Sequence, residues 1–130
     1  MPGGMEVDTP LACIKHYFAE MKALDDLYLP LPEDKDEMHA RLEKMTPRRA
    51  EIYQKYWCRN DDYWLDNSYG GTSKYTFDDG MLIESGENFN DAVFIVIRRR
   101  EYNMERRELW LFALTDDGWK IADLLIFDEQ

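Results

Sequence analysis

The sequence predicts an α+β domain in which three N-terminal helices precede an antiparallel sheet of four to five strands. In the first half of the chain, apolar residues recur at three- and four-residue spacing, which is typical of helices. Residues 91–128 instead contain three apolar or alternating runs separated by two turn signals. A length of 130 residues suits one domain that is large enough for a real core. Residues 1–8 are expected to be a loose leader, so the single domain covers residues 9–130.

Capping residues and prolines divide the helical half into three predicted helices. Thr9-Pro10 supplies an N-cap and a first-position proline, and the helix that it opens is expected to end near residue 28. A second helix is predicted over residues 33–45, with acidic side chains in its first turn that complement the helix dipole. Thr46-Pro47 repeats the cap-and-proline pattern and opens a third helix that reaches about residue 58.

The strands are predicted from apolar runs and turn residues. Five β-branched or aromatic residues stand in a row at 93–97, and the runs 108–115 and 119–127 follow, which indicates a three-stranded antiparallel meander. The hairpin tip is expected at 102–105, and Asp116-Asp117-Gly118 is expected to form a turn with glycine in the left-handed region. Earlier strands are expected at 81–85 and, as a short one, at 75–77. The central strands are apolar on both faces, so they need a cover on each side or one cover plus a partner subunit.

Composition excludes several classes of function. The net charge of −11 argues against nucleic acid as a partner, whereas it suits a basic protein partner or simply solubility. No apolar run approaches the roughly 20 residues that a membrane span needs, and no signal pattern opens the chain. Cys13 and Cys58 lack metal-like spacing, so we expect free thiols in a reducing cytoplasm. His16 and His39 lie on different predicted helices, and neither a metal site nor a cofactor is expected.

Two stretches resemble the nuclear transport factor 2-like superfamily. They are residues 10–29 (PLACIKHYFAEMKALDDLYL) and residues 117–125 (DGWKIADLL). The resemblance implies a cone in which the helices pack into the concave side of a strongly curved, cystatin-like sheet. The superfamily includes isomerases, dehydratases, cyclases, transport adaptors and bacterial immunity proteins, so fold does not decide activity. Strong acidity, two extra charged helices and the lack of an evident catalytic set make this chain most similar to the immunity branch, whose members neutralise a toxin of the same cell.

The best interface candidate is an aromatic and acidic stretch between the helices and the sheet. Tyrosine and tryptophan ringed by acids are typical of a hot spot for a basic partner, although the same aromatics would also suit a plug for the open end of the cone. Its candidate residues are Tyr56, Trp57, Asp61, Asp62, Tyr63, Trp64, Asp66 and Tyr69. The start of the second helix is either a steering surface or a solvated rim, and it adds Glu33, Asp34, Asp36 and Glu37.

A cluster of five arginines at the tip of the long hairpin is a possible second contact. These side chains either pair with acids across the strands or contact an acidic patch of a partner or a dimer mate. The cluster comprises Arg98, Arg99, Arg100, Arg106 and Arg107.

An alternative function is a small-molecule-binding protein or an enzyme of the isomerase, dehydratase or cyclase type. It would need a base and a donor in an apolar pocket, for which Asp123, His16 and Tyr17 are candidates. Asp123 is expected to share a strand face with Trp119, Ile121 and Leu125, and it qualifies if that face points into the cone. The simpler interpretation gives Asp123 an arginine partner or an exposed edge, and pairs His16 with Glu20 on a helix surface. The sequence therefore favours a cytoplasmic, non-enzymatic immunity protein that occludes a basic toxin. A homodimer through the open sheet face remains an alternative assembly.

Overall fold

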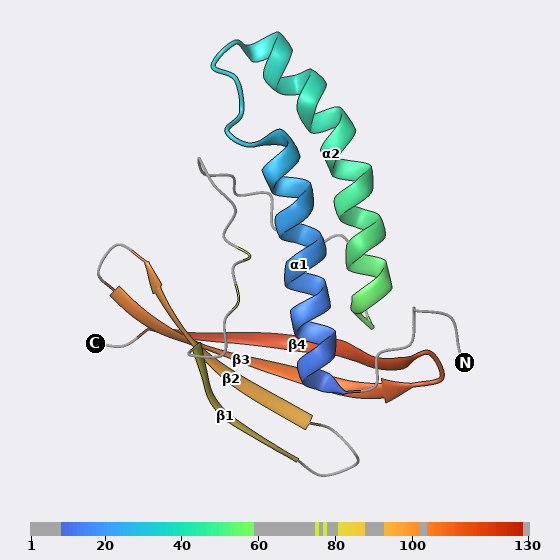
Figure 1. The fold of residues 1–130 in the computed structure, drawn as a ribbon, viewed down its shortest axis with the longest axis vertical. Helices are drawn as coiled ribbons and strands as arrows, with labels where there is room; N and C mark the ends of the chain where they lie inside the picture. Colours follow the sequence, from blue (N-terminus) through green and yellow to red (C-terminus); the bar gives the residue numbers. More distant parts are fainter. Residues whose placement is uncertain are drawn as a thin grey trace. The chain divides into compact units, whose positions relative to one another are not determined.

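A computed structural model shows an α+β chain in which two helices precede a four-stranded antiparallel sheet (Figure 1). The residues that it describes are 9–58, 75, 77, 81–87, 93–101 and 104–128. The elements are α1 (Pro10–Tyr28), α2 (Lys35–Tyr56), β1 (Leu82–Glu87), β2 (Val93–Glu101), β3 (Met104–Thr115) and β4 (Gly118–Asp128). The chain divides into two compact units, one of residues 16–76 and one of residues 1–15 with 77–130.

The first helix begins where the sequence predicts. The Thr9 side-chain oxygen accepts a hydrogen bond from the backbone N–H of Ala12 at 3.0 Å, which confirms the N-cap. Cys13 is fully buried in this helix, whereas Cys58, just beyond α2, is exposed, and both are free thiols. One stripe of α1 is buried, and its apolar members are Cys13, Ile14, Tyr17, Phe18, Met21 and Leu24.

The second and third predicted helices are one helix, so the prediction of three helices is wrong. The Asp34 side chain caps α2 by accepting from the backbone N–H of Glu37 at 3.0 Å, and the helix then continues through Pro47. A proline inside a helix costs about 3 kcal/mol. Here the buried stripe keeps its phase across it, because Met45 and Arg49 on either side are both buried. Burial of one continuous stripe therefore outweighs the local signal for a new helix start at Thr46-Pro47.

Aromatic side chains fill the interior of the unit that contains residues 16–76. Tyr17 of α1 contacts Tyr75 with ring centroids 5.8 Å apart, and Tyr53 stacks on Trp57 at 5.0 Å. Tyr56 also packs edge-on against Tyr17, at 5.9 Å. Tyr56 and Trp57 are each only 3% exposed, so these two predicted interface residues belong to the core.

A buried ion pair joins the two helices, which lie side by side in Figure 1. The Arg49 Nη1 atom lies 2.8 Å from the Asp25 carboxylate, and the two side chains are 2% and 4% exposed. The Arg49 guanidinium also lies over the Tyr75 ring, 5.8 Å from its centroid. Loss of either partner would leave the other charge buried, so the pair fixes how α1 and α2 meet.

The sheet is the predicted meander, with strand order β1-β2-β3-β4 and every pair antiparallel. Pairing reaches Glu101 opposite Met104, and Gly118 closes the next turn with φ of 105°, as predicted. The described residues form four strands, and neither Tyr75 nor Phe77 lies in one.

The sheet is not strongly curved, which corrects the predicted cone. Strong bends in a sheet need bulges or glycine kinks. The central pair β2–β3 instead runs through nine successive residue pairs without a break in register. The two irregularities lie elsewhere, in the β1–β2 pair and in the β3–β4 pair.

The two faces of the sheet differ in burial. One face, which we call the inner face, holds the buried strand residues Ile95, Ile97, Arg99, Glu108, Trp110, Phe112 and Ile121. The opposite face, which we call the outer face, presents three rows across β2, β3 and β4. These rows are Arg98–Arg107–Phe127, Val96–Leu109–Leu125 and Phe94–Leu111–Asp123.

A bulge in β4 moves Asp123 to the outer face. Leu111 lies opposite Asp123 and Phe112 lies opposite Ile121, so Ala122 is the extra residue. Neighbouring residues of β3 point to opposite faces, and therefore Asp123 and Ile121 do as well. The prediction that Asp123 shares a face with Ile121 is wrong for this reason.

A glycine in β1 makes room for an aromatic ring on the outer face. A Cβ atom at Gly86 would lie 2.8 Å from two ring atoms of Phe94, the residue opposite it in β2. We expect Gly86→Ala to lower the free energy of unfolding by about 1 kcal/mol, because the ring must move away. In a Phe94→Leu background the same change should be neutral or stabilising, since Gly costs entropy in a strand. Urea unfolding of the four variants measures the coupling, and equal effects in both backgrounds would contradict the contact.

The aromatic interior makes the fold sensitive to alkali. Burial raises the pKa of Tyr17 above its ordinary value of 10.0, and burial raises that of Tyr75 well above it. Unfolded tyrosines ionise first, so this stability is complete below pH 10 and is lost as the pH rises through the folded pKa values. Tyr75→Phe should therefore flatten the fall in unfolding free energy above pH 10, measured by urea unfolding at several pH values. Tyr28→Phe, outside the cluster, is the control, and an equal effect of both changes would refute the prediction.

Candidate functional site

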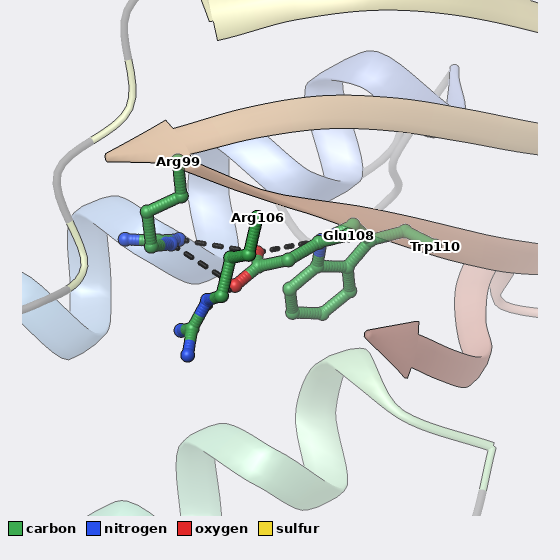
Figure 2. A network of polar contacts seen from close by, with 4 residues as sticks. All are labelled: Arg99, Arg106, Glu108 and Trp110. Carbon is green, nitrogen blue, oxygen red and sulfur yellow. Dashed lines mark hydrogen bonds and ion pairs between the residues drawn. The ribbon is translucent and has the colours of Figure 1, made fainter. Parts of the chain in front are cut away.

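A buried polar network on the inner face joins β2 to β3 (Figure 2). Its centre is Glu108, which is 3% exposed. Arg99 reaches it from β2 with two donors, Nε at 3.0 Å from Oε2 and Nη2 at 3.3 Å from Oε1. On β3, Nη2 of Arg106 lies 3.0 Å from Oε2, and the indole N–H of Trp110 donates to Oε1 at 3.2 Å. Both carboxylate oxygens are therefore held by neighbouring donors, which suits a clamp between strands more than a catalytic base.

The same register sets two pairs of arginines directly opposite each other. Arg99 faces Arg106 on the inner face, and Arg98 faces Arg107 on the outer face. Like charges opposite each other destabilise a sheet. Glu108 compensates the inner pair, whereas the outer pair consists of exposed side chains, with Arg98 3.9 Å from Glu105. The predicted arginine cluster is thus divided between a structural role inside and a charged surface outside.

The exposed pair Arg98 and Arg107 borders an apolar surface on the outer face. Next to it, Val96 and Leu109 are half-buried, and Leu125 is 45% exposed in the same row. Phe94 and Leu111 of the following row are half-buried too. Apolar area bordered by arginine is typical of protein interfaces. The sequence pattern indicates that both faces of the central strands are apolar, but only the strand register shows which residues form the outer face.

The alternative catalytic residues are not brought together within either unit. His16 is exposed on α1, and Glu20 accepts from Lys55 at 2.9 Å and from the Tyr56 hydroxyl. Tyr17 lies in the aromatic interior. Asp123 is half-buried and accepts from the backbone N–H of Leu124 at 2.8 Å, in the other unit.

The acidic candidates around the start of α2 are exposed. Glu33, Asp34, Asp36 and Glu37 all reach solvent, and Asp34 also serves as the N-cap. The remaining acidic and aromatic candidates lie outside the described residues. They are Asp61, Asp62, Tyr63, Trp64, Asp66 and Tyr69, and the side chain of Arg100 is likewise not described.

A groove between α1 and α2 is a feature that sequence reasoning did not find. Its volume is about 330 Å³. It is lined by Glu20, Ala23, Leu24, Leu27, Arg48, Glu51, Ile52 and Lys55. Its lining combines acidic and basic side chains with apolar ones, and Leu27 among them is 71% exposed.

The described parts of the chain contain neither a candidate metal site nor a helix that could span a membrane. No group of three histidine, cysteine or acidic side chains there could hold a metal ion. Neither described helix is both long enough and apolar enough to cross a membrane. Comparison with protein-family models, with curated proteins and with solved structures finds no match to this chain. The superfamily resemblance therefore rests on the two sequence stretches alone.

The clamp predicts a specific loss of stability. Glu108→Gln removes the carboxylate charge that Arg99 and Arg106 both contact, so we expect a loss of about 3 kcal/mol in unfolding free energy. The control Asp117→Asn, whose carboxylate is 83% exposed and 3.9 Å from Lys120, should cost less than about 1 kcal/mol. Arg106→Ala added to Glu108→Gln should recover part of the loss, since it removes the repulsion. Urea unfolding checks all three, and a Glu108→Gln cost equal to the control would contradict the clamp.

Proposed function

We propose that this chain is a cytoplasmic protein-binding module, an immunity protein that neutralises a cognate toxin by steric and electrostatic occlusion. The immunity branch of the nuclear transport factor 2-like superfamily comes from the resemblance of residues 10–29 and 117–125, without that superfamily's strongly curved cone. The observation that supports a binding role is the outer face, where an apolar surface ends in an exposed Arg98–Arg107 pair. Apolar area bordered by arginine is the composition typical of a protein interface.

Electrostatics supports a fast encounter with a basic toxin. The net charge is −11, and the exposed acids at the start of α2 add a local concentration of negative charge. Opposite charges across an interface raise the association rate more than they raise affinity. The acids would therefore steer the toxin, and apolar contacts would supply the lasting affinity.

The enzyme alternative has less support from the geometry. It requires Asp123, His16 and Tyr17 to converge in a pocket. The α1–α2 groove contains none of the three, and Asp123 lies on the outer face. A binding module is therefore the function that the described residues favour.

The test is protection and binding with the product of the neighbouring gene. Coexpression of this chain should restore growth to cells that make the toxin, and the purified proteins should form a complex. Failure both to bind and to protect would end the immunity proposal.

Steering by the acidic helix start has its own signature. The double change Asp36→Lys with Glu37→Lys should lower the association rate about tenfold at low salt, and the difference should shrink at high salt. Asp116→Lys with Asp117→Lys, at the exposed β3–β4 turn, is the control with the same change in net charge and should change the rate little. Surface plasmon resonance at two salt concentrations measures this, and an equal effect of the control and the Asp36/Glu37 variant would exclude steering by this site.

A further inference from the structure

The last strand leaves an apolar edge of the described sheet exposed. The strand order places β4 at one edge. Leu125, Ile126 and Phe127 are 45%, 50% and 54% exposed. Leu125 and Phe127 lie on the outer face and Ile126 on the inner face, so the edge is apolar on both sides. An exposed hydrophobic edge is a template for pairing with another strand.

The opposite edge of the sheet is protected in the ways that edge strands usually are. β1 has six residues, its sequence is LIESGE, and its register shifts between Leu82 and Glu84. Shortness, charge and bulges all discourage pairing. In β4 the bulge lies at Ala122, before the apolar segment, and residues 124–127 contain no charge and no proline. The chain therefore blocks one edge and leaves the other competent to pair.

We infer that β4 pairs with β4 of a second copy of this chain, antiparallel and about a two-fold axis at Leu125. A two-fold axis between identical edge strands requires antiparallel pairing, and each copy then contributes the same surface. In this register Leu125 lies opposite Leu125 of the second copy, and Leu124 lies opposite Ile126 of the second copy. The centre of the contact is therefore apolar. The result is one eight-stranded sheet.

Charge complementarity favours a second copy as the occupant. On the outer face, Arg98, Arg107 and Phe127 form one row, and the two-fold pairing continues this row into Asp123 of the second copy. Arg107 lies two strand spacings from that carboxylate, roughly 10 Å between backbones, a distance that two extended side chains cross. The two-fold symmetry produces this contact twice. In each copy, the Asp123 carboxylate of the other copy lies at the end of the row of Arg98, Arg107 and Phe127.

Pairing at the edge leaves the outer face free. The apolar row of Val96, Leu109 and Leu125 would run without interruption across both copies. The dimer would thus present a doubled outer face to other partners. This inference does not depend on the immunity function, because its test uses the chain alone.

Solution mass tests the pairing. Light scattering or sedimentation equilibrium of the Cys58→Ser chain excludes disulfide dimers through the exposed thiol. We expect the Cys58→Ser chain to have the mass of a dimer. The variants Leu125→Lys and Ile126→Lys should each have the mass of a monomer, since lysine on an edge discourages pairing. Leu114→Lys, which removes a 60%-exposed leucine from β3, should stay dimeric. A monomeric parent chain, or lysine variants on β4 that remain dimeric and folded by circular dichroism, would overturn the inference.

Cross-linking keeps the inference testable if a lysine variant does not fold. In the Cys58→Ser background, Leu125→Cys should form an intermolecular disulfide on oxidation, because opposed residues have Cβ atoms within bonding reach. Phe127→Cys would lie opposite Asp123 of the second copy, four residues from its own counterpart, and should not cross-link. The reverse pattern, or no cross-link at either position, counts against this register and this edge.

Discussion

The long β2–β3 hairpin depends on one buried carboxylate. Strand pairing sets Arg99 opposite Arg106, and Glu108 offsets their repulsion by accepting hydrogen bonds from Arg99 and forming an ion pair with Arg106. Arg99 is buried and Arg106 is 29% exposed, so removing the carboxylate would leave positive charge on the inner face at a cost of several kcal/mol. The register then decides which side chains reach the outer face. The surface proposed for binding is thus held in place by a contact on the other side of the sheet.

Features set by short-range hydrogen bonding were predictable from the sequence. Thr9 caps α1 as expected, the β3–β4 turn has Gly118 at positive φ, and the meander follows the three apolar runs. Each depends on a few adjacent residues whose side chains or backbone freedom favour one conformation. The predicted start of the second helix, residue 33, lies two residues before the observed start of α2 at Lys35. The observed start follows Asp34, whose side chain caps the helix.

Features set by distant burial were not predictable in this way. Pro47 looks like a helix start, but the stripe from Met45 to Arg49 stays buried across it. The strand pattern placed Asp123 beside Ile121 because alternation was assumed to continue, and the bulge at Ala122 reverses it. Tyr56 and Trp57 resembled an exposed hot spot, yet Tyr17 and Tyr53 cover them. In the arginine cluster, Arg99 and Arg106 pair with Glu108, whereas contact with a partner stays a prediction, and only the pairing register separates the inner side chains from the outer ones.

The two thiols of the chain are native reporters of its motion. Cys13 is fully buried in α1, whereas Cys58 is exposed after α2. A thiol reagent therefore modifies Cys58 in the folded state, but it reaches Cys13 only when α1 leaves its packed position. The slower reaction measures how often that part of the chain opens. Modification of Cys13 therefore reports the opening of α1, and modification of Cys58 serves as the internal standard for the reagent.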